Sequence, residues 1–294
     1  MENKKSENSI TALIDMTDKE AQSKLGKIGL VAGNGNFPLL FVDSMAKNNT
    51  PFVVVGLSGF VEPKVKEIAT ANGKFIEVFM SNFGKVVNFF KKEGVSTVVI
   101  IGGVNKKAIR LNFYVFKMLL RLIFFKKKND GVFRIIISEF EKKGFKVVGV
   151  QDAMPTLMAK PGLLTKTKPS EQNAKDIEYA IEKCRDFGKT DLGQSIVVKD
   201  KCIIGTESHL GTDALMEQAL AAKNGEKGGV MAKLAKEGQE ERGDIPAIGF
   251  QTVQQLIDAK IDGIIVDAGY KTIIEEKEKL AEFADKNNIF IMAV

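Results

Sequence analysis

The chain has 294 residues, of which 43 are Lys or Arg and 37 are Asp or Glu, giving a formal net charge of +6. Its 44% hydrophobic and 27% charged residues are typical of a globular protein long enough for two domains. Only two cysteines, Cys184 and Cys202, and one histidine, His209, are present. The sequence therefore excludes a disulfide scaffold and a zinc site of Cys and His ligands. Acid–base or metal chemistry would depend on carboxylates, with lysines and backbone N–H groups binding anions.

Residues 1–24 are polar and contain no apolar run of the kind that a signal peptide needs. We interpret them as a mobile N-terminal tail, in which a short helix is compatible with the sequence. The two cysteines agree with a reducing compartment, so the sequence predicts a cytoplasmic protein.

From residue 27 onward, short apolar runs alternate with helical patterns. We expect strands at 27–32, 52–55, 75–79, 97–101 and 146–150. Helices are expected at 39–47, 64–71 and 85–93, and two more within 108–143 on either side of a break at 128–131. Continuously apolar strands alternating with helices predict a parallel sheet covered on both faces. Residues 25–152 are thus predicted to form a Rossmann-like domain.

Residues 151–169 are rich in Pro and Gly and resemble a linker. After it, we expect helices at 170–186, 213–222, 253–260 and 273–287, the first capped by Ser170. Strands are expected at 195–199, 202–206, 229–235, 247–250, 263–266 and 289–293. The fold class is therefore α/β, with a distinct second α/β domain over residues 153–294.

An apolar stretch at 111–125 is too short to span a membrane, and Lys117 and Arg121 interrupt it. Three lysines follow at 126–128. A buried helix is the favoured interpretation. The alternative is a helix with basic edges that contacts lipid or acyl chains at a membrane surface.

Glycine-rich turns follow two of the first-half strands, at the edge of a parallel sheet where ligands bind. Their backbone N–H groups and side chains are candidates for holding phosphates, although purely structural turns are the alternative. The candidate residues are Gly33, Asn34 and Gly35 after the first strand, and Gly102, Gly103, Asn105 and Lys106 after the fourth.

These turns do not match the dinucleotide fingerprint. Pro38 stands where the third glycine belongs, and the strand at 52–55 is followed by no acidic residue that could bind a ribose. The sequence therefore disfavours a nicotinamide cofactor, but it is compatible with a nucleotide phosphate.

In the second half, Thr212 is predicted to cap a helix and Asp213 to lie in its first turn. One interpretation is that Asp213 only complements the helix dipole. If a phosphate binds here instead, the carboxylate would repel it unless a divalent cation bridges the two. Glu207, just upstream, is a candidate second ligand of that cation.

Further charged residues lie downstream. Lys233, Lys236 and Arg242 are candidates for clamping phosphates, and Asp244 for binding metal or orienting Arg242. A surface loop of ion pairs is the alternative. Asp267, directly after the strand at 263–266, adds another carboxylate.

Taken in order, these blocks resemble the LpxI family of UDP-2,3-diacylglucosamine pyrophosphatases over residues 25–294. The blocks include Gly33-x-Gly35-x-Phe37-Pro38, Gly102-Gly103-Val104-Asn105-Lys106, Gly211-Thr212-Asp213, Lys236-x-Gly238-Gln239-x-x-Arg242-x-Asp244-x-Pro246 and Ala268-Gly269. Leu210 departs from the pattern, because the family usually has Glu before Gly-Thr-Asp.

The resemblance implies a cytoplasmic enzyme of lipid A synthesis that uses Mg²⁺ or another divalent cation. It would hydrolyse UDP-2,3-diacylglucosamine to 2,3-diacylglucosamine 1-phosphate and UMP, with water attacking the phosphorus on the sugar side. Asp213 would be the critical acid. We assign catalysis to Asp213, Lys233, Arg242 and Asp244, and metal binding to Asp213, Glu207, Asp244 and Asp267. Substrate binding is assigned to the glycine turns with Asn105 and Lys106, and to Thr212, Lys236 and Gln239.

Two alternatives stay open: a non-catalytic protein that binds a nucleotide sugar or lipid, and, less favoured, a nicotinamide-dependent oxidoreductase. Nucleic acid is not an expected partner, because no aromatic platform accompanies the basic residues. Contact with the inner-membrane surface and a homodimer are both compatible with the sequence.

Overall fold

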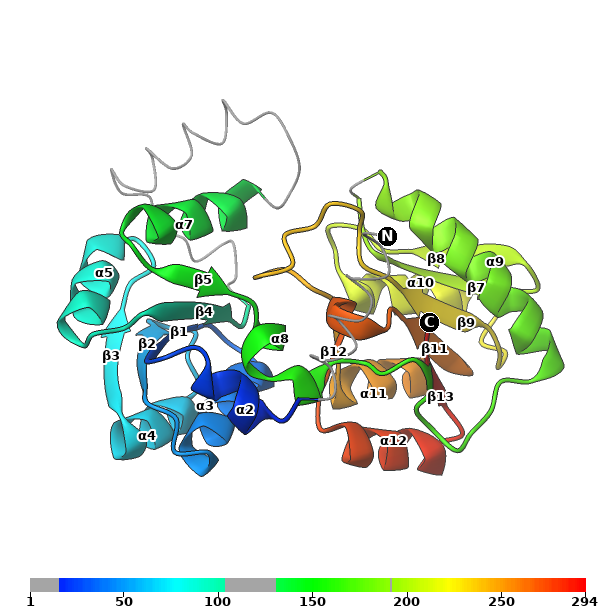
Figure 1. Cartoon of the computed structure of the whole chain (residues 1–294). Coiled ribbons are helices and arrows are strands. Elements are labelled where there is room, and N and C mark those ends of the chain that lie inside the picture. Colours follow the sequence, from blue (N-terminus) through cyan, green and yellow to red (C-terminus); the bar gives the residue numbers. More distant parts are fainter. Residues whose placement is uncertain (1–15, 104–130, 191) are drawn as a thin grey trace, which may run out of the picture. The chain divides into compact units, whose positions relative to one another are not determined.

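The computed structural model describes residues 16–103, 131–190 and 192–294 (Figure 1). They form two compact units. The N-terminal unit comprises the described residues up to Thr156 together with Glu240–Asp244, and the C-terminal unit contains the rest of the described residues from Leu157 to Val294. Each unit is an α/β structure with its own sheet, which confirms the predicted fold class.

The sheet of the N-terminal unit has five strands in the order β3-β2-β1-β4-β5, and all neighbouring strands are parallel. The strands are β1 (Ile28–Ala32), β2 (Phe52–Leu57), β3 (Lys74–Val78), β4 (Thr97–Ile101) and β5 (Lys146–Val148). Every residue of β1 and β2 is buried, as expected for central strands covered on both faces. The order reverses between β1 and β4, so the loops after these two strands flank the switch point where doubly wound sheets bind ligands.

Helices cover both faces of this sheet (Figure 1). One face carries α3 (Asn36–Lys47) and α4 (Pro63–Asn72), and the other α5 (Phe83–Lys92) and α7 (Gly131–Lys142). Phenylalanines join the second pair: the Phe140 ring centroid lies 4.7 Å from that of Phe83 and 6.2 Å from that of Phe90. Such aromatic contacts add to the free energy of burial, so they fix α7 against α5.

The described end of the segment that we assigned to a tail, residues 1–24, folds with this unit as helix α2 (Asp18–Ser23). Thr17 and Glu20 form a capping box at its start. The fully buried Gln22 side chain donates to Ser44 Oγ (3.0 Å) and accepts from Thr50 Oγ1 (2.8 Å). These satisfied buried groups attach α2 to α3 and its following turn.

The C-terminal unit has a six-stranded mixed sheet in the order β6-β13-β11-β9-β7-β8. Its strands are β6 (Gly162–Leu163), β7 (Ser195–Lys199), β8 (Cys202–Thr206), β9 (Val230–Lys233), β11 (Gly263–Val266) and β13 (Phe290–Ala293). Strands β9, β11 and β13 are parallel, whereas β7 runs antiparallel to both β9 and β8. A separate parallel pair joins β10 (Ala247–Ile248) to β12 (Ile273–Ile274).

Alternate residues of these strands serve two cores. Ile196, Val198 and Ala232 face α9 (Glu171–Gly188). Val197 and Met231 point to the other face and share a core with residues of α10 (Thr212–Ala222), α11 (Phe250–Asp258) and α12 (Lys277–Lys286). Successive side chains of these strands thus point to opposite faces of the sheet, and each face has its own core, as expected for pleated strands.

Several predicted elements differ from the structure. The expected strand at 146–150 ends at Val148, and Val150 begins a helix. The expected helix at 273–287 starts only at Lys277, because Ile273 and Ile274 pair with β10 and Glu276 has a left-handed backbone with φ of 36°. The expected strand at 247–250 ends at Ile248, since Phe250 begins α11. The linker at 151–169 contains α8 (Val150–Ala153), a 3₁₀ turn and β6.

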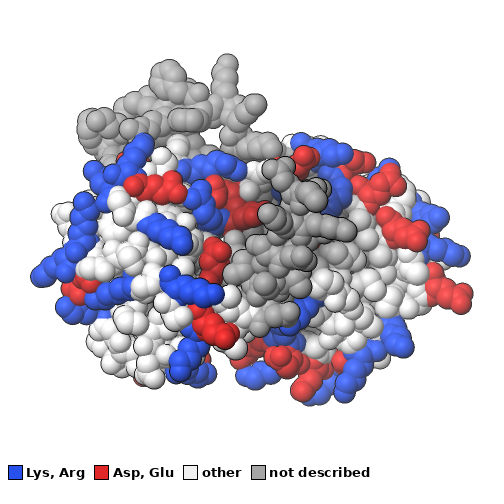
Figure 2. Space-filling model, viewed as in Figure 1, with Lys and Arg blue, Asp and Glu red and all other residues white. Residues whose placement is uncertain are grey.

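The predicted apolar helix at 111–125 and the lysines after it lie outside the described residues. Within the described ranges, every helix is too short or too polar to span a bilayer. On the face drawn in Figure 2, basic and acidic side chains are intermingled. Charge alone therefore does not mark that face as a binding surface.

A buried lysine lies at the opposite end of the central strands from their carboxyl ends. Lys223 is 5% exposed, and its Nζ donates to the carbonyl oxygens of Gly228 (2.9 Å) and Lys260 (2.7 Å), which precede β9 and β11. Burial lowers the pKa of Lys223 to about 8, although Asp262 partly opposes the shift. The folded state therefore releases this proton more readily than the unfolded chain.

We expect the free energy of unfolding to rise between about pH 8 and 10.5, relative to a Lys223→Met variant. In this window the unfolded chain holds the lysine proton and the folded chain has lost it, so increasing pH favours folding, by about 1–3 kcal/mol in total. Urea denaturation across this pH range measures the difference. A difference that stays flat or falls with pH would contradict the assignment.

Candidate functional site

The two glycine turns of the N-terminal unit bind each other. The Gly33 N–H donates to the Ile101 carbonyl (2.8 Å), the Asn34 N–H to that of Gly103 (3.0 Å), and the Gly103 N–H back to that of Asn34 (3.1 Å). A Cβ atom at Gly33 would lie 2.5 Å from the Gly103 carbonyl oxygen, so only glycine allows this approach.

This pairing limits what the turns can offer a phosphate. Three of their N–H groups are already bonded, so the start of α3 is the better candidate for binding an anion. Gly35 occupies the N-cap of that helix with φ of 96° and provides no side-chain cap. Asn105 and Lys106 lie outside the described residues, so their predicted role stays a prediction.

In the C-terminal unit, the sheet brings several predicted site residues to one edge. Lys233 ends β9, directly beside Val266 of β11 and opposite Ser195 at the start of β7. Glu207 follows β8, and its N–H donates to the Ser195 carbonyl (2.9 Å). Parallel and antiparallel neighbours thus place Glu207, Lys233 and Asp267 along the same edge.

Glu207 is held in place by two loops. Its carboxylate accepts from the Gln194 N–H (3.0 Å) and from Thr212 Oγ1 (3.3 Å). The predicted cap at Thr212 is wrong: Gly211, with φ of 85°, is the N-cap, and Thr212 is the first residue of α10. Its hydroxyl is therefore directed to Glu207 rather than to the helix backbone.

Asp213 lies exposed in the first turn of α10. Its carboxylate accepts a hydrogen bond from the Gln255 side-chain amide of α11, a partner that the sequence did not suggest. A solvent-accessible carboxylate next to a helix N-terminus can bind a cation or water, and the contact with Gln255 orients it.

Lys233 is half-buried, and its Nζ donates to the Ala247 carbonyl of β10 (3.1 Å). Burial lowers the pKa of Lys233, while the negative charge of Glu207 opposes this shift. In the described part of the chain, no carboxylate lies within ion-pair distance of this ammonium. A half-buried cation that no carboxylate contacts is suited to receive an anion from a ligand.

Asp267 is bound differently from the other predicted metal ligands. It is 2% exposed, and its carboxylate accepts from the Ala235 N–H (2.7 Å) and from both terminal nitrogens of the Arg185 guanidinium, one at 2.9 Å. This ion pair raises the pKa of Arg185. Asp267 thus attaches the loop after β9 to the end of β11 and to α9.

The described residues contain no group of three or more His, Cys, Asp or Glu side chains that could hold a metal ion. Mg²⁺ does not require such a cage, since it commonly uses one or two carboxylates and completes its shell with phosphates and water. Glu207 and Asp213, on either side of Thr212, fit that smaller donor set. Asp267 is the weaker candidate, because it is buried in an ion pair with Arg185, whereas Asp213 is exposed; the hydrogen bonds that Glu207 accepts involve no cation. Metal binding by Glu207 and Asp213 stays a prediction.

Lys236 and Gln239 belong to the loop after β9. The Gln239 side chain accepts from the Lys236 N–H (3.0 Å) and donates to Gln194 Oε1 (3.4 Å). Because Gln239 is buried, it shapes the loop that carries Lys236. Their predicted contact with substrate stays a prediction.

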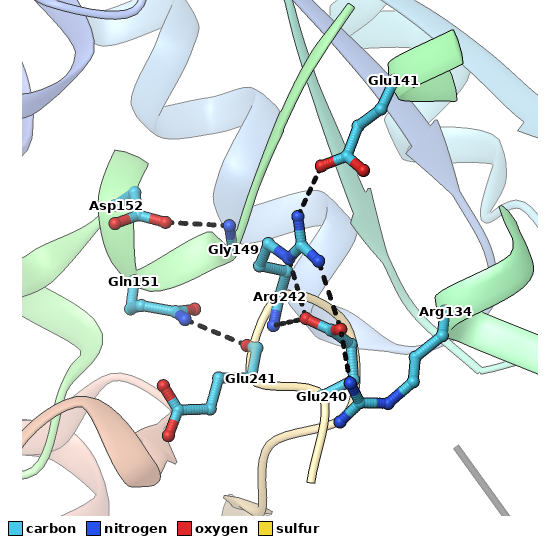
Figure 3. A network of polar contacts seen from close by, with 8 residues as sticks. All are labelled: Arg134, Glu141, Gly149, Gln151, Asp152, Glu240, Glu241 and Arg242. Atoms are coloured by element: carbon cyan, nitrogen blue, oxygen red, sulfur yellow. Dashed lines mark hydrogen bonds and ion pairs between the residues drawn. The ribbon is translucent and has the colours of Figure 1, made fainter. Parts of the chain in front are cut away.

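Residues 240–244 of that motif, with Arg242 and Asp244, belong to the N-terminal unit (Figure 3). Arg242 donates to both oxygens of Glu240 (2.7 and 3.2 Å) and to Glu141 of α7 (2.7 Å). The Gln151 amide donates to the Glu241 carbonyl (2.9 Å). Arg242 thus fixes the loop 240–244 on α7 and Gln151 fixes it on α8, while the guanidinium charge of Arg242 is balanced by two carboxylates.

This network shifts the pKa values of both partners: that of Glu240 is lowered and that of Arg242 raised, chiefly by their mutual hydrogen bonds. Asp244 is half-buried in the same loop, and its N–H donates to the Glu240 carbonyl (3.0 Å). The structure therefore groups Asp244 with Arg242 in one unit, and Glu207, Asp213 and Lys233 in the other. Phosphate binding by Arg242 and metal binding by Asp244 stay predictions.

Comparison with known proteins agrees with this arrangement. Residues 27–157 match the family model of the LpxI N-terminal domain, and residues 160–292 match that of the LpxI C-terminal domain. The chain is similar to UDP-2,3-diacylglucosamine pyrophosphatase LpxI of Caulobacter vibrioides, with 29% identity over 278 residues covering 91% of this chain and 97% of the relative. With both domain models matched in order across nearly the whole sequence, the chain belongs to the LpxI family.

Proposed function

We propose that this chain hydrolyses the pyrophosphate bond of UDP-2,3-diacylglucosamine, giving 2,3-diacylglucosamine 1-phosphate and UMP, as a step of lipid A biosynthesis. The similar Caulobacter protein carries the name of this activity. The observation that carries the proposal is the edge of the C-terminal sheet. There, α10 begins with the exposed carboxylate of Asp213, and β9 ends with the half-buried ammonium of Lys233, which has no ion-pair partner among the described residues.

In this proposal, Lys233 neutralises charge that builds up on a phosphoryl oxygen during cleavage. Asp213 and Glu207 hold Mg²⁺, which when bound supplies Lewis-acid stabilisation of the phosphate oxygens. The positive end of α10 favours the same anion. Lys236, in the loop ordered by Gln239, adds a second positive charge for binding the phosphates.

The reaction breaks one P–O bond and consumes one water. Attack on the sugar-side phosphorus places the oxygen of water in the sugar 1-phosphate, and the bridging oxygen leaves with UMP. Hydrolysis in ¹⁸O-labelled water therefore reports which phosphorus is attacked, because only one product gains the label.

We expect the full chain to release UMP from UDP-2,3-diacylglucosamine in Mg²⁺ buffer, with the ¹⁸O label in the sugar phosphate. Excess EDTA should stop turnover, and added Mg²⁺ should restore it. Mass spectrometry of both products measures the label. Binding of the substrate without any release of UMP would favour the alternative, a non-catalytic binding protein.

The proposal includes a cytoplasmic location with contact at the inner-membrane surface, since the substrate carries acyl chains. Its support is the apolar and basic sequence at 111–128, which lies outside the described residues. Sedimentation of the full chain with anionic vesicles, compared with neutral ones, tests this contact. A homodimer remains part of the proposal, and light scattering of the full chain measures it.

A further inference from the structure

A buried serine at the sheet edge has no role in the assignments above. Ser195, the first residue of β7, is 0% exposed, and its Oγ has no hydrogen-bond partner among the described residues. An unpaired buried hydroxyl destabilises the folded state, so a serine in such a place needs an explanation. The explanation lies on the neighbouring strand.

Ser195 pairs directly with Lys233 of β9 across the antiparallel ladder. Residues opposite each other in such a ladder project from the same face, with Cβ atoms about 4.5–5.5 Å apart. Val197 and Met231, two residues along each strand, mark this face as the one covered by α10 and α11. The hydroxyl and the ammonium stem thus lie side by side, at the edge where α10 begins.

The hydrogen-bonding capacity of the two groups is complementary. A lysine ammonium has three N–H donors, and that of Lys233 spends one on the Ala247 carbonyl. Ser195 Oγ offers an acceptor that no described group uses. A ligand oxygen would be the third acceptor of the ammonium, after the Ala247 carbonyl and Ser195 Oγ. With two N–H groups held by the protein, the remaining one would have a fixed direction toward the ligand.

We propose that Ser195 is a positioning residue whose hydroxyl oxygen accepts one hydrogen of the Lys233 ammonium when that ammonium binds a phosphoryl oxygen of the substrate. This inference rests on the proposed function. The Ala247 carbonyl and Ser195 Oγ would hold the ammonium from two sides, and the third N–H would point to the phosphate. Lys233 remains the group that touches the substrate, and Ser195 acts through it.

The main test is Ser195→Ala. We expect kcat/KM for UDP-2,3-diacylglucosamine to fall about 10- to 150-fold, the cost of one hydrogen bond to a charged group. The melting temperature should stay level or rise, because the change removes an unpaired buried hydroxyl. A hydroxyl with a purely structural role would instead lower the melting temperature. Ser138→Ala on α7, a half-buried serine of the other unit, is the matched control and should leave kcat/KM unchanged.

A double variant separates positioning from a general effect. If Ser195 acts only through the ammonium, Ser195→Ala should cost nothing further in a Lys233→Met chain. Independent losses that multiply in the double variant would overturn the inference, as would a Ser195→Ala chain with the kcat/KM of wild type. Lys223→Met, at the opposite edge of the same sheet, controls for loss of a buried lysine and should leave kcat/KM unchanged.

Binding of inorganic pyrophosphate, measured by calorimetry on the same chains, separates this inference from the proposed function. A loss of pyrophosphate affinity in Ser195→Ala that is absent when the same change is made in the Lys233→Met chain would support the pairing even if wild type released no UMP. Normal turnover by wild type together with unchanged affinity in Ser195→Ala would overturn the pairing and leave the proposed hydrolysis standing.

Discussion

Replacing Asp213 with alanine is expected to reduce UMP release at least about 100- to 1,000-fold while leaving a folded chain that still binds substrate. The carboxylate is exposed in the first turn of α10, and it accepts a hydrogen bond from the Gln255 amide. Its removal therefore opens no cavity in the core. The expected change in the free energy of unfolding is about 1 kcal/mol, from the lost hydrogen bond and the lost interaction with the helix dipole.

Two further variants sharpen this prediction. Asp213→Asn keeps an acceptor for the Gln255 amide but removes the negative charge. This variant should therefore be as stable as wild type and as inactive as Asp213→Ala. Glu217→Ala removes another exposed carboxylate one turn along α10 and should retain activity. UMP release, thermal melting and substrate binding by calorimetry measure the three properties. Full activity in Asp213→Ala would remove the central role given to this residue.

The strands of the N-terminal unit could be predicted because each central one is a short run of apolar residues between clear turns. The strand β12 could not, since Ile273 and Ile274 precede a charged run that suits a helix equally well. Only pairing with β10, 26 residues upstream, makes them a strand. Tertiary pairing thus overrides the local pattern, as short strands often show.

The candidate site divides in the same way. Asp213, Glu207 and Lys233 could be proposed from local motifs, because each stands at the end of a helix or strand. The partners of Asp267 and Arg242 could not: Arg185 lies 82 residues from Asp267, and Glu141 lies 101 residues from Arg242. The sequence does not distinguish a charged residue at a strand end that forms an ion pair from one that binds a substrate. For Ser195, the sequence offers one indication of a special role, which is a hydroxyl side chain at the start of an apolar strand.

Asp267→Ala is expected to lower the free energy of unfolding by about 2–3 kcal/mol, the cost of leaving charged and polar partners unpaired. The buried carboxylate accepts from the Ala235 N–H and from the Arg185 guanidinium. Arg185 is 40% exposed and can regain water, which keeps the loss below that of a fully buried pair. Urea denaturation measures the change, and Asp258→Ala, an exposed carboxylate on α11, should cost less than 1 kcal/mol by the same method.

The same variant decides between two roles for Asp267. If the carboxylate only anchors the loop after β9, any remaining activity should need the same Mg²⁺ concentration as wild type. The loss of stability should also be shared with Arg185, so that the double variant Asp267→Ala, Arg185→Ala costs less than the sum of the single ones. If Asp267 binds the metal instead, the single variant should stay as stable as wild type and require more Mg²⁺. The contacts with Arg185 and Ala235 favour the first outcome, because a carboxylate whose oxygens already accept these hydrogen bonds would have to give them up to bind a cation.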